Sequence, residues 1–247
     1  MTDPSRYLPW PKTSHWSEIA AACRPNAADR RRAFEAICEN FRGPVYSYLR
    51  REGRGYDEAQ DLAQEFFLYL LDESQPLAGY DRDQSRFRTF LLGVLRHFLK
   101  GRRRYEGARK RGGGQSFVSM DAGPPGLADI AGAGPTPEVE YTRAWAGTLL
   151  DGVIATLREE EARSPRRTPI EPLLARLIEG KSASYDDMAE ELGMTAGSLR
   201  VAALRLRKRF EQLLRRDIAR TVPRADDVED EIRELFAAYA SPERSAP

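Results

Sequence analysis

Apolar residues recur at intervals of three and four positions along most of the 247-residue chain. This spacing is typical of amphipathic helices, and no alternating stretch of useful length suggests a β-strand. The helical stretches are residues 28–51, 56–72, 85–104, 137–163, 173–179 and 228–239, with two more helices on either side of Gly193. The first stretch is either one helix or two helices with a break at Gly43-Pro44. The sequence therefore predicts an all-α fold.

The composition changes sharply after the third helical stretch. From Gly112 to Tyr141 the chain has seven Gly, four Pro and four acidic residues but no Lys or Arg. Such a composition predicts a flexible linker between two small helical domains. The expected parts are an N-terminal extension (1–27), a first helical domain (28–111), an acidic Gly/Pro-rich linker (112–136), a second helical domain (137–221) and an acidic C-terminal tail (222–247).

The 39 basic and 38 acidic residues almost cancel, but they are segregated along the chain. Residues 86–111 carry ten bases and one acid, and residues 196–220 carry eight bases and two acids. Residues 57–73, by contrast, carry six acids and no base, and residues 226–247 carry seven acids and two bases. Two separate basic blocks suggest two contacts with a polyanion such as nucleic acid. The alternative is that both blocks are solvated helix faces.

Few residues suggest catalysis or metal binding. Cys23 and Cys38 form no CxxC motif, and neither His15 nor His97 belongs to a nucleophile or HExxH motif. The chain also has no glycine-rich phosphate-binding loop, so we expect a protein that is not an enzyme and uses no metal or cofactor. A start without a signal-peptide pattern, and apolar runs far shorter than ~20 residues, predict a soluble, cytoplasmic protein with no membrane span.

Residues 184–210 have the pattern of two helices joined by a tight turn. Ser184 can cap the first helix together with Asp187, and Thr195 can cap the second. Gly193 allows the left-handed conformation that ends a helix. The second helix has an apolar stripe made of Leu199, Ala203, Leu206, Phe210 and Leu213. Together these features predict a helix-turn-helix in the second domain.

The side of this second helix opposite its apolar stripe carries candidate DNA-binding residues. They are Ser198, Arg200, Val201, Leu204, Arg205, Arg207 and Lys208, together with Thr195 at the start of the helix. The first turns of a recognition helix reach base edges, and flanking Lys and Arg residues reach phosphates. Val201 and Leu204 are apolar on this basic face, which either thymine methyl contact or packing against a neighbouring helix would explain. For the whole motif, the alternative to DNA binding is a helical hairpin with a solvated face.

Residues 85–104 combine an apolar face with a basic one. Phe90 and Phe98 fall on the apolar face, so we expect them in the core. The basic residues are candidates for binding single-stranded or melting DNA through its phosphates. These candidates are Arg86, Arg88, Arg96, His97, Lys100 and Arg103.

Residues 56–72 form an acidic counterpart to these basic helices. Glu58, Asp61 and Glu65 recur at helical spacing and share one face. DNA would repel such a face. It either pairs with a basic partner protein or is ordinary solvated surface.

Three runs, taken in their order, resemble those of the extracytoplasmic-function type of bacterial sigma factor: EAQDLAQEFFLYLL, FRTFLLGVLRHFLKGRRR and GMTAGSLRVAALRLRKRF. The resemblance covers about residues 28–221 and implies two helical domains, the family's regions two and four. The residues that it implies for binding core RNA polymerase are Glu58, Asp61, Gln64 and Glu65. The first domain would also hold the unpaired minus-ten strand of promoter DNA, and the second would read the minus-thirty-five duplex. An anti-sigma factor or another regulator is a further candidate partner.

Two other classes of function fit the sequence. One is a dimeric helix-turn-helix transcriptional regulator that does not bind polymerase as a sigma subunit, although the first domain resembles neither an effector pocket nor a dimerisation domain. The other is a protein-interaction adaptor with vestigial DNA contacts. For the acidic tail, the helix over 228–239 either folds back on the second basic block or packs its apolar edge on the second domain.

Overall fold

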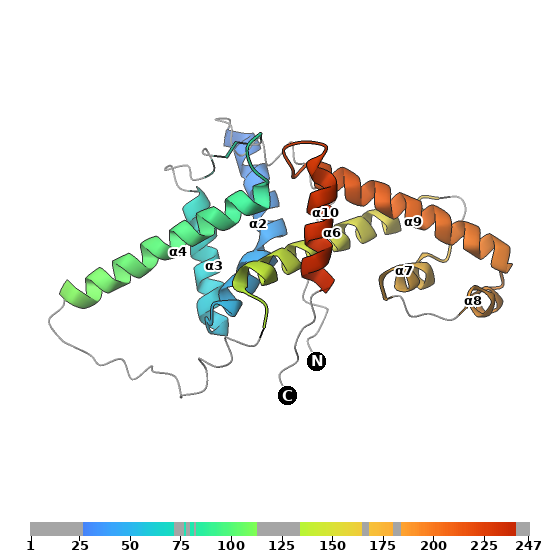
Figure 1. Ribbon diagram of the computed structural model, residues 1–247, viewed down its shortest axis with the longest axis horizontal. Helices are drawn as coiled ribbons and strands as arrows, with labels where there is room; N and C mark the ends of the chain where they lie inside the picture. The colour runs from blue at the N-terminus through green and yellow to red at the C-terminus, as the bar shows by residue number, and fades with distance from the viewer. Residues whose placement is uncertain are drawn as a thin grey trace. The chain divides into compact units, whose positions relative to one another are not determined.

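The computed structural model describes residues 27–71, 77, 80–81, 83–112, 134–164, 168–179 and 184–240. These residues contain eight α-helices and no β-strand, which confirms the all-α fold (Figure 1). The helices are α2 (Ala27–Arg51), α3 (Tyr56–Leu71), α4 (Phe87–Gly112), α6 (Pro137–Ala162), α7 (Ile170–Glu179), α8 (Tyr185–Glu191), α9 (Ala196–Ala219) and α10 (Asp227–Ala240). Nearly all of the predicted N-terminal extension and most of the predicted linker lie outside the described residues. None of the described helices is both long and apolar enough to cross a membrane.

Features other than the apolar pattern help to determine how far α2 and α4 extend. α2 is one continuous helix through Gly43 and Pro44, which excludes the alternative with a break. The side chain of Pro44 is buried, and this packing offsets the backbone hydrogen bond that a proline removes. α4 continues to Gly112, about two turns beyond the predicted end. Its last turns are rich in good helix formers, and Arg102 pairs with Glu106 one turn later (3.2 Å).

The described chain divides into two compact units whose bounds differ from the expected domains. The smaller unit comprises Thr148–Ile218, which includes the second half of α6, α7, α8 and nearly all of α9. The larger unit comprises the described residues up to Gly147 and those from Ala219 onward. The start of α6 and the whole of α10 therefore belong with α2, α3 and α4.

Aromatic side chains from α2, α4 and α6 form the core of the larger unit. The ring of Phe41 stacks on that of Trp145 with centroids 4.4 Å apart, and it meets the ring of Phe87 edge-on at 5.4 Å. Tyr141 is fully buried, and its hydroxyl donates to the carbonyl oxygen of Arg88 (3.1 Å). Aromatic pairs of this kind contribute about 0.5–1.5 kcal/mol each beyond area burial. They explain why the first turns of α6 belong to this unit.

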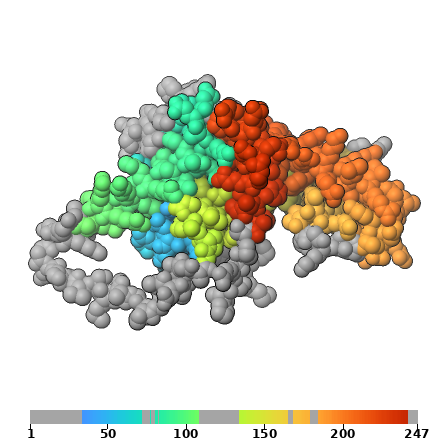
Figure 2. Space-filling model, in the orientation of Figure 1, coloured from blue at the N-terminus to red at the C-terminus, as the bar shows by residue number. Residues whose placement is uncertain are grey.

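A buried ion pair attaches α10 to the start of α4. The guanidinium of Arg88, a residue only 4% exposed, donates to both carboxylate oxygens of Glu231, at 2.5 and 3.0 Å. Glu231 is completely enclosed, and Glu234 lies 2.7 Å from the same guanidinium. Burial alone would lower the pKa of Arg88, but the hydrogen bonds and charges of Glu231 and Glu234 outweigh it and raise that pKa. Figure 2 shows α10 lying against the first turns of α4.

The position of α10 corrects the expectation that the tail helix folds back on the second basic block, because its carboxylates Glu231 and Glu234 pair instead with Arg86 and Arg88. Val228, Leu235 and Ala238 are buried on its inner side. Arg143 of α6 donates a hydrogen bond to the carbonyl oxygen of Ala238 (3.2 Å). The helix is therefore packed into the larger unit, and its partner lies far away in sequence, where local spacing gives no sign of it.

Replacing Glu231 should destabilise the protein strongly, because the Arg88 charge would stay buried without its bidentate partner. We expect Glu231→Ala to lower the free energy of unfolding by about 3–5 kcal/mol. Urea unfolding followed by far-UV circular dichroism measures this. The matched control is Asp230→Ala, which removes an exposed carboxylate paired with Arg233 and should cost less than about 1 kcal/mol. Similar losses in the two variants would contradict the role assigned to the buried pair.

Candidate nucleic-acid interface

Local hydrogen bonds fix α8, the turn after it and the start of α9. Ser184 and Asp187 form a reciprocal capping box in which both hydrogen bonds are 3.1 Å long. Gly193 has a φ of +63°, in the left-handed region that favours glycine, just after the end of α8. The hydroxyl of Thr195 then accepts a hydrogen bond from the backbone N–H of Ser198 (3.2 Å). These bonds set the direction in which α9 leaves the turn.

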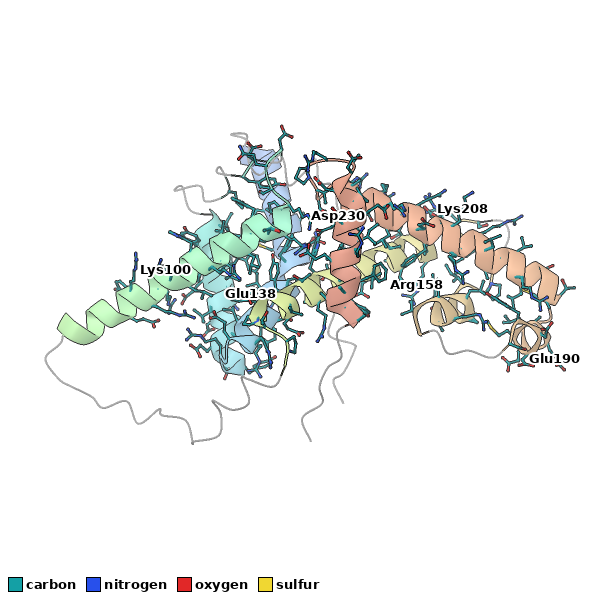
Figure 3. All side chains as sticks on the ribbon, in the orientation of Figure 1. Lys100, Glu138, Arg158, Glu190, Lys208 and Asp230 are labelled. Carbon is teal, nitrogen blue, oxygen red and sulfur yellow. The ribbon has the colours of Figure 1, made fainter. Side chains whose placement is uncertain are left out.

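One side of α9 is buried against α7 and α8. Leu199 is fully enclosed in a cluster with Leu173 of α7 and with Met188 and Ala189 of α8. Lys208 lies on the opposite side of α9, turned away from α7 and α8 (Figure 3). A helix that buries one stripe exposes the opposite one, so this packing decides which residues of α9 face outward.

The outward side of α9, together with Thr195 just before its first residue, carries every candidate DNA-binding residue that the sequence places in this region. These residues, which we call the α9 arc, are Thr195, Ser198, Arg200, Val201, Leu204, Arg205, Arg207 and Lys208, all of them exposed. Arg205, Arg207 and Lys208 have no ion-pair partner among the described residues. Arg209, just outside the arc, is instead paired with Glu160 (2.5 Å). The arc thus presents cations without internal partners, which suit it to a polyanion.

The two apolar members of the α9 arc are also open to solvent. Leu204 is 64% exposed and Val201 is 48% exposed. Packing against a neighbouring helix, the alternative considered for these residues, therefore does not account for Leu204 in the described part of the chain.

Arg200 is held by groups on α8. Its guanidinium pairs with the carboxylate of Asp186 (3.0 Å) and lies 6.0 Å from the ring centroid of Tyr185. Arg176 covers the same ring at 4.2 Å. A surface pair of this kind is worth only about 0–1 kcal/mol, so Arg200 can exchange Asp186 for another acceptor. Sequence reasoning missed Asp186 because it resembles any acid in the first turn of a helix.

The exposed side of α4 forms a second basic surface. Its candidate residues Arg96, His97, Lys100 and Arg103 are all exposed, and Figure 3 shows Lys100 projecting from the helix. Arg96 pairs with Glu138 (2.5 Å), whose hydrogen bond raises the pKa of Arg96. Arg103 pairs with Glu52 (2.8 Å). His97 and Lys100 have no polar partner among the residues that the structure describes, so they are the most available groups of this surface.

Two further candidates, Arg86 just before α4 and Arg88 in its first turn, lie away from this surface. Arg88 is buried and bound by Glu231, so its guanidinium is not offered to a phosphate. Arg86 is partly buried and lies 2.7 Å from the same carboxylate. The partner of Arg88 is 143 positions away in sequence, which is why spacing alone placed both arginines with the DNA-binding candidates.

α3 presents an exposed strip that consists of an acid, an amide and a leucine. Asp61 and Gln64 are exposed, and Leu68, at the next helical positions along the same side, is 66% exposed. We call these three residues the α3 strip. Leu68 was missed because it falls within the run FFLYLL, in which Phe66, Phe67 and Leu70 are buried.

The other two acidic candidates of α3 already have partners. Glu58 is exposed and pairs with Arg54 (2.5 Å). Glu65 is half-buried and pairs with Arg102 of α4. Asp61 has no ion-pair partner among the described residues, so of the three acidic candidates of α3 it is the most available to another molecule.

No protein-family model, curated protein or solved structure matches this chain at a significant level. The described residues include no group of His, Cys, Asp or Glu side chains that could hold a metal ion. The α9 arc and the α3 strip are opposite in charge, and each is suited to a different class of partner. The arc suits a polyanion, and the strip suits a protein surface with basic and apolar groups.

Arg200→Ala and Arg205→Ala should weaken DNA binding in different ways. Arg200 lies in the first turns of α9, where base edges are within reach, whereas Arg205 is further along and is expected to meet phosphate. We expect Arg200→Ala to lower the binding free energy by about 1–3 kcal/mol on a duplex that the protein selects from a randomised library. The variant should also discriminate less between this duplex and a scrambled one. Arg205→Ala should weaken selected and scrambled duplexes about equally.

Fluorescence anisotropy titrations of each variant on both duplexes measure these effects. Equal losses on the selected and the scrambled duplex for Arg200→Ala would show that this side chain does not read sequence.

Proposed function

We propose that this chain is a promoter-specificity subunit of bacterial RNA polymerase, a sigma factor of the extracytoplasmic-function type that acts in the cytoplasm. In this proposal α8, the turn at Gly193 and α9 form a helix-turn-helix that reads the minus-thirty-five duplex. The basic surface of α4 contacts the unpaired minus-ten strand, and the α3 strip binds core polymerase. The chain performs no covalent chemistry itself, because the polymerase makes the RNA.

The α9 arc is the observation that carries this proposal. Arg205 and Lys208 are three positions apart on one side of a helix, and neither has an ion-pair partner among the described residues. Like charges at this spacing destabilise a helix by about 0.2–0.5 kcal/mol per pair. Phosphates on either side of the helix would relieve that repulsion, and a capped turn followed by an exposed basic helix is the arrangement of a recognition helix.

The α3 strip favours a sigma factor over a regulator that binds DNA alone. A single exposed leucine is ordinary, but Leu68 lies in line with Asp61 and Gln64. DNA would repel Asp61, whereas a protein surface with a basic group and an apolar pocket would engage the whole strip. A regulator that contacts only DNA has no use for such a surface.

Substitutions in the α3 strip should weaken binding to core polymerase. We expect the double variant Asp61→Lys, Leu68→Asp to bind at least about tenfold more weakly, because central interface residues carry most of the binding energy. Both side chains are exposed, so the fold should be retained. Glu65 is left unchanged because its replacement would also break the pair with Arg102. Titration of labelled protein with purified core polymerase gives the affinity.

The matched control is Asp230→Lys, a charge reversal on α10 that should leave the affinity for polymerase unchanged. If the double variant keeps wild-type affinity with an unchanged circular dichroism spectrum, the α3 strip is not the polymerase surface. If the wild-type protein itself does not bind core polymerase, the DNA-only regulator becomes the better explanation.

A further inference from the structure

The apolar residues of the α9 arc occupy its centre. At about 100° per residue, the positions directly opposite the buried stripe are Val201, Leu204 and Lys208. Arg207 lies along one edge of the arc, and Arg205 lies along the other. An amphipathic helix normally has apolar residues on its buried side, so two exposed apolar residues in the middle of the opposite side need a separate explanation.

Both side chains are accessible, and they lie close together. Val201 and Leu204 are three positions apart, which is about 4.5 Å along the helix axis. Beyond them, Glu211 lies about two turns further along the same side and pairs with Arg215 (3.0 Å). An acid at that point would oppose phosphate, so the part of α9 that can face a polyanion ends before it.

The charges around Val201 and Leu204 indicate that duplex DNA is the molecule that covers this apolar pair. Arg205 and Arg207 border the pair on opposite sides, and neither has an ion-pair partner among the described residues. The major groove has matching geometry, since it is about 12 Å wide and has phosphates along both walls and base edges at its floor. A helix about 10–12 Å across can enter it with the edges of its arc toward the phosphates and the centre toward the bases.

We propose that Val201 and Leu204 contact the C5 methyl groups of thymines in the bound duplex and thereby recognise these bases. This inference rests on the proposed function of α9. Thymine is the base that presents an apolar group in the major groove. An apolar side chain at the centre of the arc gains nothing from the donors and acceptors of the other bases, but it can bury a methyl group. The duplex preferred by α9 therefore contains thymine opposite these two side chains.

The sharpest test removes the methyl group and nothing else. The full-length protein first selects its preferred duplexes from a randomised library, and each thymine of a selected duplex is then replaced by deoxyuridine. This replacement keeps every hydrogen-bonding group of the base. We expect a loss of about two- to fivefold in affinity at one or two thymines, since burying one methyl group corresponds to a factor of about four.

Alanine variants show whether Val201 or Leu204 contacts each methyl group. Val201→Ala and Leu204→Ala should each weaken binding to the thymine duplex by about the same factor and abolish the effect of deoxyuridine at one position. The control Arg207→Ala should weaken the thymine and uracil duplexes equally, because it removes a phosphate contact.

Three results would overturn the inference. Specific binding in which every deoxyuridine is neutral would exclude methyl readout but leave DNA binding by α9 intact. A deoxyuridine effect that persists in both alanine variants would assign the methyl contact to other residues. Failure of the wild-type protein to select any duplex over scrambled DNA would remove the proposed function of α9 itself, and a protein would then become the expected occupant of the apolar pair.

Discussion

The buried charge of Arg88 has to be neutralised inside the molecule, and Glu231 does so with two hydrogen bonds. A buried ion without its partner costs several kcal/mol, so α10 has to dock on α4 whenever the larger unit is folded. This requirement explains why an acidic C-terminal helix shares one compact unit with helices that precede it by more than a hundred residues. It also removes Arg88 from the groups that could bind nucleic acid.

The arginines of the smaller unit also differ in whether they form an ion pair with another residue of the chain. Arg209 is paired with Glu160, and this pair lowers the pKa of that carboxyl group through the hydrogen bond. Arg205 and Arg207 have no ion-pair partner among the described residues, and they border an exposed apolar centre. Arg200 is intermediate, because Asp186 holds it at the surface without burying it. Paired cations stabilise the fold, and unpaired cations are available to a ligand.

Features that depend on neighbouring residues could be predicted from the sequence, and those that depend on distant partners could not. The Ser184–Asp187 capping box and the turn at Gly193 were predicted because their groups lie within a few positions of one another. The burial of Arg88 was missed because its partner is 143 residues away. The exposure of Leu68 was missed for a related reason, since an apolar run does not say which of its members the rest of the fold will cover.

Run-off transcription is the most direct test of whether this protein acts as a sigma factor. Bacterial core polymerase is incubated with genomic DNA fragments in the presence and absence of this protein, and the transcripts are mapped to their start sites. If the protein is a promoter-specificity subunit, discrete transcripts should require it and should begin at a fixed distance from a common upstream sequence. Identical transcripts with and without the protein, under conditions in which it binds those fragments, would contradict its role as a promoter-specificity subunit.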